Sequence, residues 1–330
     1  MSESSLAVVG LGYWGPNLAR NVAAVPGARL SWCCESDPAA RERVEPLPRG
    51  CRFSDSLDEV LADGELDGVL LATPVRTHAE LAIRVLEAGK HCFVEKPLAQ
   101  SVADAQRVLD AAQASGRVLM VGHLLEYHPG VAALEALIEA GELGRIHYIY
   151  TNRLNLGLLR SDENALWSLG AHDVSVILRL LGGEEPIEAD ARGECYMRPG
   201  VEDVVFAFLR FPSGVSAHLH LSWLDPHKER RLTVVGSRRM ATFDDMAAER
   251  KLTIYDKGFD ESAEHWGEYI ARSGPATSPQ IPDTEPLALE VEHFVRAIQD
   301  GLTPRSDGHS GLRVVRVLES LQAQLDLTRR

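Results

Sequence analysis

Short apolar runs alternate with amphipathic, helix-like stretches at the start of the chain. The run Val69-Leu70-Leu71-Ala72 has no polar position, which is typical of a strand buried on both faces of a sheet. Strands that alternate with helices in this way predict a doubly wound α/β domain with a parallel sheet over residues 1–122. The predicted strands are residues 6–9, 29–34, 69–72, 92–94 and 118–121.

The hydrophobic pattern changes after about residue 123. Between residues 215 and 222 apolar and polar residues alternate, so one face of this strand is apolar and the other polar. Residues 256–286 contain Gly, Ser, Thr and Pro throughout and predict a long loop or lid. We expect an α+β domain with a mostly antiparallel, open sheet over residues 123–330. Its predicted elements include a strand at 146–156 and helices at 131–140, 167–181, 290–300 and 312–325.

A glycine-rich turn follows the first predicted strand. Gly10-Leu11-Gly12-Tyr13-Trp14-Gly15 matches G-x-G-x-x-G and precedes a helical stretch. Glycines there allow a tight turn and let backbone N–H groups approach a pyrophosphate at the helix N-terminus. Glu35 ends the second strand, where its carboxylate can accept hydrogen bonds from both ribose hydroxyls and would repel a 2′-phosphate. The pattern predicts a dinucleotide site and favours NAD over NADP.

Polar residues follow directly on the other apolar strands of this domain. Thr73, Glu95, Lys96 and His123 all stand at or just past such ends. Because the C-terminal ends of parallel strands meet at one edge, these residues should converge with the glycine turn. We expect the Lys96 ammonium to bind a substrate hydroxyl and to stabilise negative charge beside the nicotinamide. We expect Glu95 to orient the lysine or the cofactor. A solvated surface lysine is the alternative.

Composition narrows the class of protein. The chain has 330 residues, of which 45% are hydrophobic and 25% charged, as expected for a globular protein of two domains. A net charge of −14 provides no basic field for nucleic acid or an anionic membrane. No leader and no membrane-spanning run is evident, and five cysteines without framework spacing fit a reduced cytoplasm. We expect these cysteines to be small apolar residues of the core.

The chain resembles the glucose-fructose oxidoreductase/inositol dehydrogenase family, Gfo/Idh/MocA, over nearly its whole length. The resemblance is carried by the glycine motif with Pro16-Asn17, by Ala72-Thr73-Pro74 with His78, by Glu95-Lys96-Pro97 and by Gly170-Ala171-His172-Asp173. Three further phrases are similar to the sugar-nucleotide 3-dehydrogenases, such as those oxidising UDP-N-acetylglucosaminuronic acid, and to related enzymes of amino-sugar antibiotic pathways. They are Arg153-Leu154-Asn155-Leu156-Gly157, Leu166-Trp167-Ser168 and Val234-Val235-Gly236.

The resemblance implies that His172 acts with Lys96 and that the Lys96-Pro97 bond is cis. Taken alone, His172 could accept a proton, because the unperturbed pKa of histidine lies near neutrality, although a helical histidine is often only a partner of a backbone group. Many inositol dehydrogenases carry an aspartate four residues before this histidine, where this chain has Ser168. A proton relay there is therefore in doubt, and Asp173 cannot replace it directly because adjacent helical residues diverge by about 100°. The 3-dehydrogenase-like relatives also carry serine.

A polar cluster lies between the predicted strand at 146–156 and the helix that carries His172. Its members are Arg153, Asn155, Arg160 and Asn164, with Trp167 after them. An arginine can hold a diphosphate or carboxylate through two parallel hydrogen bonds, and asparagines match sugar hydroxyls, although an ordinary charged strand end is the alternative. Tyr127 either closes the pocket or packs, and Trp14 would press on the cofactor or on a neighbouring subunit. The predicted cofactor-binding residues are Gly10, Gly12, Tyr13, Trp14, Gly15, Glu35, Thr73, Pro74, His78, Glu95 and Lys96. The predicted substrate-binding residues are Lys96, His123, Tyr127, Arg153, Asn155, Arg160, Asn164, Trp167 and His172.

The polar face of the 215–222 strand carries His218 and His220. Two histidines at i and i+2 could bind a metal, but no third ligand is evident from the spacing. A face packed against a second subunit is the preferred interpretation, and the open sheet face is a usual oligomer interface in the resembled family. We expect a homodimer or homotetramer without a metal.

These inferences predict an NAD-dependent dehydrogenase. We expect it to oxidise a secondary hydroxyl, at C3, of a nucleotide-linked hexose or an amino-sugar intermediate, with Lys96 and His172 as the catalytic residues that handle the hydroxyl proton. The alternatives are an inositol dehydrogenase, a glycoside hydrolase that uses NAD transiently, and a non-enzymatic NAD-sensing regulator. The presence of both Lys96 and His172 argues against the regulator. The hydrolase would produce no net NADH.

Overall fold

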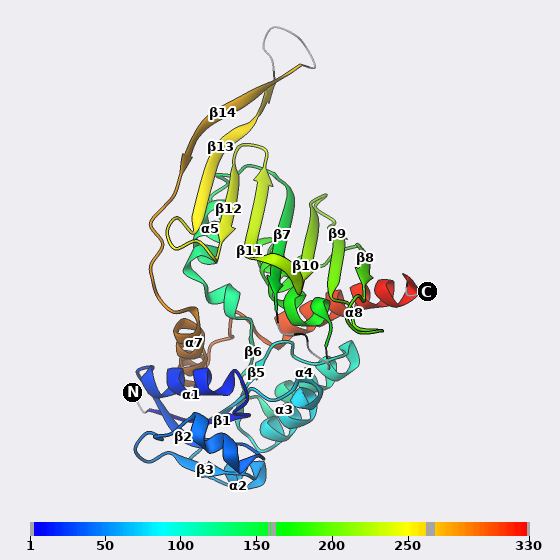
Figure 1. The fold of residues 1–330 in the computed structure, drawn as a ribbon. Helices are drawn as coiled ribbons and strands as arrows, with labels where there is room; N and C mark the ends of the chain where they lie inside the picture. Colours follow the sequence, from blue (N-terminus) through cyan, green and yellow to red (C-terminus); the bar gives the residue numbers. More distant parts are fainter. Residues whose placement is uncertain (1–2, 158, 160–162, 262–267, 329–330) are drawn as a thin grey trace. The chain divides into compact units, whose positions relative to one another are not determined.

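The computed structural model describes residues 3–157, 159, 163–261 and 268–328 (Figure 1). The chain divides into two compact units. The N-terminal unit comprises Met1–Tyr127 with Thr284–Arg316, and the C-terminal unit comprises His128–Asp283 with Val317–Arg330. The predicted contiguous domains, 1–122 and 123–330, differ from this division mainly because residues 284–316 return to the first unit. That return depends on packing between segments far apart in sequence, which no local pattern predicts.

The N-terminal unit is built on a parallel sheet, as the sequence predicted. The sheet has six strands, and β3 (Arg52–Ser54) was not among the five predicted ones. The strand order is β3-β2-β1-β4-β5-β6, so strands are added outward from β1 on one side and outward from β4 on the other, while β1 and β4 themselves are parallel. This is the doubly wound order in which ligands bind at the carboxyl edge beside the point where the strand order reverses. The strands are β1 (Ser4–Val9), β2 (Ala28–Cys34), β3 (Arg52–Ser54), β4 (Gly68–Leu71), β5 (His91–Glu95) and β6 (Leu119–Gly122). The helices are α1 (Gly15–Ala24), η1 (Pro38–Arg43), α2 (Leu57–Leu61), η2 (Val75–Thr77), α3 (His78–Glu87), α4 (Val102–Ser115), η3 (Leu124–Tyr127), α7 (Pro286–Asp300) and the start of α8 (Gly308–Thr328).

The core of this unit explains why its strands were visible in the sequence. Every residue of β1 and β4 is buried, because helices cover both faces of the sheet. α7 packs on α1 and η3, and Phe294 of α7 meets Phe93 of β5 edge to face with ring centroids 5.8 Å apart. A helix more than 150 residues away along the chain therefore completes the hydrophobic core of the first unit.

The C-terminal unit is an α+β domain with an eight-stranded sheet of order β14-β13-β12-β11-β7-β10-β9-β8. Only β7 and β10 pair in parallel, and the other neighbouring strands are antiparallel. The strands are β7 (Ile146–Leu156), β8 (Glu188–Glu194), β9 (Val204–Arg210), β10 (Ser216–Ser222), β11 (Leu224–Gly236), β12 (Met240–Asp244), β13 (Leu252–Glu261) and β14 (Tyr269–Thr277). The helices are α5 (Pro129–Glu139), the π-helical turn η4 (Leu166–Gly170), α6 (Ala171–Leu180) and the end of α8 (Gly308–Thr328).

The predicted alternation along β10 is confirmed. Ala217, Leu219 and Leu221 are buried on one face. On the other face His218 stacks on Tyr150 with ring centroids 5.2 Å apart, and His220 stacks on Phe206 at 4.4 Å. The two histidines therefore belong to an aromatic surface on the sheet.

The predicted loop over residues 256–286 is wrong at residues 256–261 and 269–277, which are strand, whereas residues 278–285 form neither helix nor strand. β13 extends to Glu261 and pairs with β14, and Figure 1 shows the two strands as a long hairpin that runs past the neighbouring strands. Nearly all of β14 is exposed, so its residues show no alternation of apolar and polar positions. Pairing with β13 rather than burial holds the strand, and this is why periodicity did not reveal it.

None of the helices in the described residues combines the length and apolar character needed to cross a membrane.

Candidate active site

The glycine turn lies between β1 and α1 and leaves room for a cofactor phosphate. Gly10 has a φ of +92°, and a Cβ there would lie 2.7 Å from the carbonyl carbon of Ala72. A Cβ at Gly15 would come within 1.9 Å of the Gly10 oxygen, so this glycine permits the close packing of α1. A Cβ at Gly12 would meet nothing within 4 Å. Gly12 therefore borders open space at the N-terminus of α1, where a pyrophosphate fits.

Glu35 lies beside this turn, as predicted from its place after β2. Its Oε2 accepts a hydrogen bond from the Leu11 N–H at 2.7 Å, and its Oε1 accepts one from the Ser36 hydroxyl at 3.0 Å. Arg43 donates to the Leu11 carbonyl at 2.9 Å, so Leu11 is held from both sides. The carboxylate next to the turn is suited to ribose hydroxyls and unfavourable for a 2′-phosphate, so the residues present fit NAD.

The other two variable positions of the turn differ in environment. Tyr13 is 87% exposed, whereas Trp14 packs against the hydrophobic core of the unit. Both remain predictions as cofactor contacts.

His78 joins the loops that follow β4 and β5. One ring nitrogen lies 2.8 Å from the carbonyl oxygen of Thr73 and the other 2.8 Å from that of Pro97. A carbonyl can only accept, so both bonds form together only when the imidazole is protonated. The pKa of His78 is lowered, mainly because the ring is buried. The two backbone hydrogen bonds act in the opposite direction, and the charge of Lys96 lowers the pKa further. His78 therefore positions the Thr73-Pro74 and Lys96-Pro97 loops relative to each other.

Glu95 and Lys96 end β5 at the same sheet edge. Burial raises the pKa of Glu95 to about 7, while the charge of Lys96 acts against this rise. The carboxylate rests against Gly122 of β6, where a Cβ would lie 3.0 Å from Glu95 Oε2. The Lys96 charge also lowers the pKa values of His78 and His123. The Lys96-Pro97 bond is cis, as the resemblance implied.

The two residues predicted beyond β6 are both buried. His123 has no exposed surface, and burial lowers its pKa to about 3, so it is neutral near pH 7. The Tyr127 hydroxyl lies 3.0 Å from His293 Nδ1 and 3.1 Å from the Ser306 hydroxyl. Ser306 in turn donates to the Val121 carbonyl at 2.7 Å. Tyr127 therefore packs within its unit and ties the returning segment to β6.

Sequence reasoning missed a buried carboxyl group in the first unit. Glu290 of α7 is fully buried, and within the described residues neither of its carboxylate oxygens has a hydrogen-bond partner. Burial raises its pKa well above the ordinary value, and the nearby charges of Glu95 and Glu126 raise it further. One signal could have revealed it, because Glu290 stands on the apolar face of its helix with Leu287 and Phe294.

In the C-terminal unit, β7 and α6 are joined by a buried ion pair. Nε and Nη2 of Arg153 donate to Asp173 Oδ1 at 2.9 and 2.7 Å. Asp173 precedes Val174 in α6 and follows His172 directly, so the pair anchors the turn that carries the histidine. Ser175 donates to the His172 carbonyl at 2.9 Å, and the π-helical turn η4 ends just before α6 begins. The predicted role of Arg153 in substrate binding stays a prediction.

The remaining residues of the polar cluster are placed by different contacts. Asn164 donates to Glu202 at 2.6 Å and to Gln322 at 2.9 Å, and its side-chain oxygen accepts from the Trp167 N–H at 3.1 Å. The Trp167 indole also donates to Gln322 at 3.1 Å. Asn164 and Trp167 therefore brace the start of η4. Asn155 lies at the end of β7, and Arg160 lies outside the described residues.

The structure thus brings together two groups of predicted residues, each within its own unit. At the carboxyl edge of the parallel sheet lie the glycine turn, Thr73, Lys96 and His123, which follow the four neighbouring strands β1, β4, β5 and β6. On β7, η4 and α6 lie Arg153, Trp167 and His172.

Two family models match successive parts of the chain. The oxidoreductase family with an NAD-binding Rossmann fold, GFO_IDH_MocA, matches residues 5–123, and the GFO/IDH/MocA C-terminal domain matches residues 131–242. The first unit is therefore an NAD-binding Rossmann domain.

Individual relatives extend the likeness to nearly the whole chain. UDP-N-acetylglucosamine 3-dehydrogenase from Acidithiobacillus ferrooxidans is 29% identical, with 96% of this chain and 95% of the relative covered. Its solved structure has a TM-score of 0.85 and covers both chains completely, at 28% identity. Inositol 2-dehydrogenase 1 from Mycolicibacterium vanbaalenii is 30% identical over 92% of this chain and 87% of the relative. A solved oxidoreductase from Magnetospirillum magnetotacticum is 32% identical with a TM-score of 0.83, covering 97% of this chain and 100% of that one. The chain is a member of the Gfo/Idh/MocA family of NAD-binding oxidoreductases.

Proposed function

We propose that this oxidoreductase is a dehydrogenase that removes a hydride from C3 of a nucleotide-linked hexose or an amino-sugar intermediate. The observation that carries the proposal is the position of Lys96 at the carboxyl end of β5, in the sheet edge that also holds the glycine turn. An ammonium there can hold a hydroxyl beside the nicotinamide. The likeness to UDP-N-acetylglucosamine 3-dehydrogenase over 96% of the chain supports this substrate class.

In the proposed reaction the carbinol group loses a hydride from its carbon and a proton from its hydroxyl, and these go to different acceptors. Bound NAD supplies the acceptor for the hydride from carbon. Lys96 donates a hydrogen bond to the hydroxyl oxygen and stabilises negative charge as the O–H bond breaks. In this proposal His172 accepts the hydroxyl proton, because a neutral imidazole has one ring nitrogen free to take up a proton. Serine at position 168 cannot supply the carboxylate of an Asp–His relay.

Substrate contacts are assigned to the polar cluster around β7. Arg153 already uses Nε and Nη2 for Asp173, so only its remaining N–H groups could reach a phosphate or carboxylate. In this proposal Asn155 binds sugar hydroxyls and Arg160 provides further positive charge. A cyclitol dehydrogenase is the second candidate function, because an inositol 2-dehydrogenase is 30% identical to this chain.

A substrate screen separates these functions. UDP- and dTDP-hexoses, free amino sugars, aminoglycoside precursors and inositols would be tested for NAD reduction by absorbance of NADH. Parallel reactions would contain 2-oxoglutarate, since an acceptor that recycles NADH in place would hide product. We expect a nucleotide sugar or amino sugar to be oxidised fastest. Much faster oxidation of an inositol would replace the first candidate by the second.

Variants test the two assigned residues. Lys96→Ala and His172→Ala should each lower kcat by at least ~100-fold, the lower end for acid–base groups, with NADH affinity nearly unchanged. Lys257→Ala and His147→Ala are matched controls on exposed positions of β13 and β7. Normal turnover of a confirmed substrate by His172→Ala would refute its role.

We propose further that the chain self-associates through the aromatic face of the C-terminal sheet. Tyr148 is 41% exposed, Phe206 54% and Phe208 39%, all on this sheet. Exposed apolar surface of this kind marks interaction sites more often than isolated exposed residues do.

A further inference from the structure

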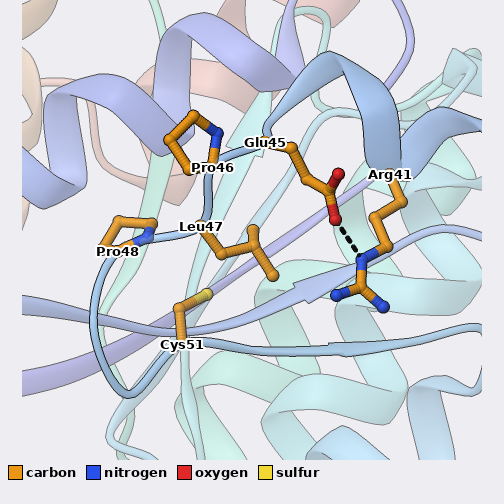
Figure 2. A pocket seen from close by; sticks show the side chains of 6 residues that line it. All are labelled: Arg41, Glu45, Pro46, Leu47, Pro48 and Cys51. Carbon is orange, nitrogen blue, oxygen red and sulfur yellow. Dashed lines mark hydrogen bonds and ion pairs between the residues drawn. The ribbon is translucent and has the colours of Figure 1, made fainter.

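An open pocket of about 610 Å³ lies on the N-terminal unit between η1 and the start of β3 (Figure 2). It is lined by Arg41, Glu45, Pro46, Leu47, Pro48 and Cys51. The Arg41 guanidinium and the Glu45 carboxylate form an ion pair at 2.6 Å, as Figure 2 shows. This pocket contains none of the residues assigned to the cofactor or the substrate.

A second thiol lies directly behind the pocket. The Cys51 sulfur is 3.9 Å from the sulfur of Cys33, which lies in β2 and is fully buried. Cys51 is partly exposed, so a small molecule in the pocket can reach it. Cys34 is the next residue of β2, and successive side chains of a strand point to opposite faces, so it faces away from the pair.

The electrostatic surroundings give the two thiols different properties. The hydrogen bond with Cys33 lowers the pKa of Cys51, partial burial opposes this, and the positive charge of Arg52 lowers it further. The pKa of Cys33 is raised by its contact with Cys51 and by burial. A thiolate is the reactive form of cysteine, so Cys51 is the nucleophile and Cys33 is the resolving thiol.

We propose that Cys33 and Cys51 form a peroxide-reactive thiol pair at the NAD domain. The Cys51 thiolate attacks one oxygen of hydrogen peroxide, the O–O bond breaks, and Cys51 becomes a sulfenic acid while hydroxide leaves and is protonated to water. The Cys33 sulfur then attacks the Cys51 sulfur, loses its proton and expels the second oxygen as water. In sum, two thiols are oxidised to one disulfide and one peroxide is reduced to two waters.

Oxidation of this pair acts on the cofactor site through the segment between the two cysteines. Bond formation requires the sulfurs to approach by roughly 2 Å. β2 and β3 are held in register, so Gly50 and Cys51, which lie outside the strands, must move. The same segment carries Arg43, whose guanidinium holds the Leu11 carbonyl in the glycine turn. Loss of one hydrogen bond from a charged donor corresponds to roughly tenfold weaker NADH binding.

The test uses the full-length protein treated with hydrogen peroxide after removal of reductant. We expect the intact mass to fall by two hydrogens. Blocking of free thiols and digestion with trypsin should then give residues 30–41 joined to residues 50–52, and reducing agent should separate them. NADH affinity, measured by fluorescence before and after oxidation, should weaken roughly tenfold and recover on reduction.

Serine variants identify the partners. Cys51→Ser, at the pocket surface, and Cys33→Ser should each abolish the cross-link and the change in affinity. Cys34→Ser is the matched control in the same tryptic peptide and should retain both. A cross-link that persists in Cys33→Ser, or oxidation that stops at a sulfenic or sulfinic acid on Cys51, would overturn the pair. A Cys33–Cys51 disulfide with unchanged NADH affinity would overturn its coupling to the cofactor site.

Discussion

The ion pair between Arg153 and Asp173 allows a quantitative test of what holds the histidine helix. The Arg153 side chain is 10% exposed and the Asp173 side chain 6%, so both charges are largely removed from water. Removing one partner leaves the other charge buried without compensation, which typically costs about 3–5 kcal/mol. We expect Arg153→Met to lower the free energy of unfolding by an amount in this range.

The double variant separates the cost of an orphaned charge from the worth of the pair. Arg153→Met with Asp173→Leu removes both charges and fills similar volume, and replacements of this kind are often neutral or stabilising. We therefore expect the double variant to be more stable than either single variant. Arg192→Met is the control in the same unit, because the Arg192 and Asp190 side chains are 63% and 56% exposed. An exposed pair of this kind contributes about 0–1 kcal/mol.

Urea unfolding followed by circular dichroism and by tryptophan fluorescence provides the measurement, with two probes because two units need not unfold together. If Arg153→Met destabilised the protein no more than Arg192→Met, the pair would not anchor α6 to β7 as its geometry indicates. The proposed function adds a second readout. At a temperature where the protein stays folded, Arg153→Met should lower kcat through displacement of His172 and leave NADH affinity unchanged, since NAD binds the other unit.

Three further predictions concern the cofactor, a buried acid and the assembly. Glu35→Ala should reduce the preference for NADH over NADPH in a fluorescence titration, and tighter NADPH binding by the unaltered protein would contradict the NAD assignment. Burial raises the pKa of Glu290 above its ordinary value of about 4.5. The protonated side chain therefore contributes fully to the free energy of unfolding below about pH 4.5, and this contribution is lost as the pH rises toward the raised pKa. Glu290→Gln should therefore remove a slope of about 1.4 kcal/mol per pH unit from urea unfolding measured just above that pH, and an unchanged slope would count against a raised pKa. Light scattering at micromolar concentration should show at least a dimer, and Phe206→Glu should weaken it; a monomeric parent protein would remove the proposed interface.

The part of the fold that could be predicted was the part whose signal is local. Strands of the parallel sheet are buried on both faces, so runs such as Val69-Leu70-Leu71 stand out against amphipathic helices. The turn at Gly10 requires a backbone conformation and a close approach that favour glycine, so it also leaves a trace in the sequence. These two signals were sufficient to place Glu35 and Lys96 at one edge of the sheet.

The β13–β14 hairpin shows where the local signal ends. Its outer part is exposed on both strands, and Tyr269 and Ile270 are 64% and 61% exposed. A strand with no buried face has no reason to alternate, so composition suggested a loop. The return of α7 to the first unit was hidden for another reason. Its amphipathic pattern predicts a helix and an apolar face, but does not say which core that face completes.

The ion pair of Arg153 illustrates why side-chain roles are harder to predict than side-chain positions. From the sequence, Arg153 was a cation at a strand end and was assigned to a substrate, and Asp173 was considered only as a partner of His172. The angle between adjacent helical residues correctly separates the Asp173 side chain from that of His172, and the structure directs it to β7 instead. A charge becomes available to a ligand only after the fold has left it without an internal partner. Arg153 has such a partner in Asp173, twenty residues further along the chain. A test of its role in substrate binding must therefore distinguish the loss of the ion pair with Asp173 from the loss of a contact with the substrate.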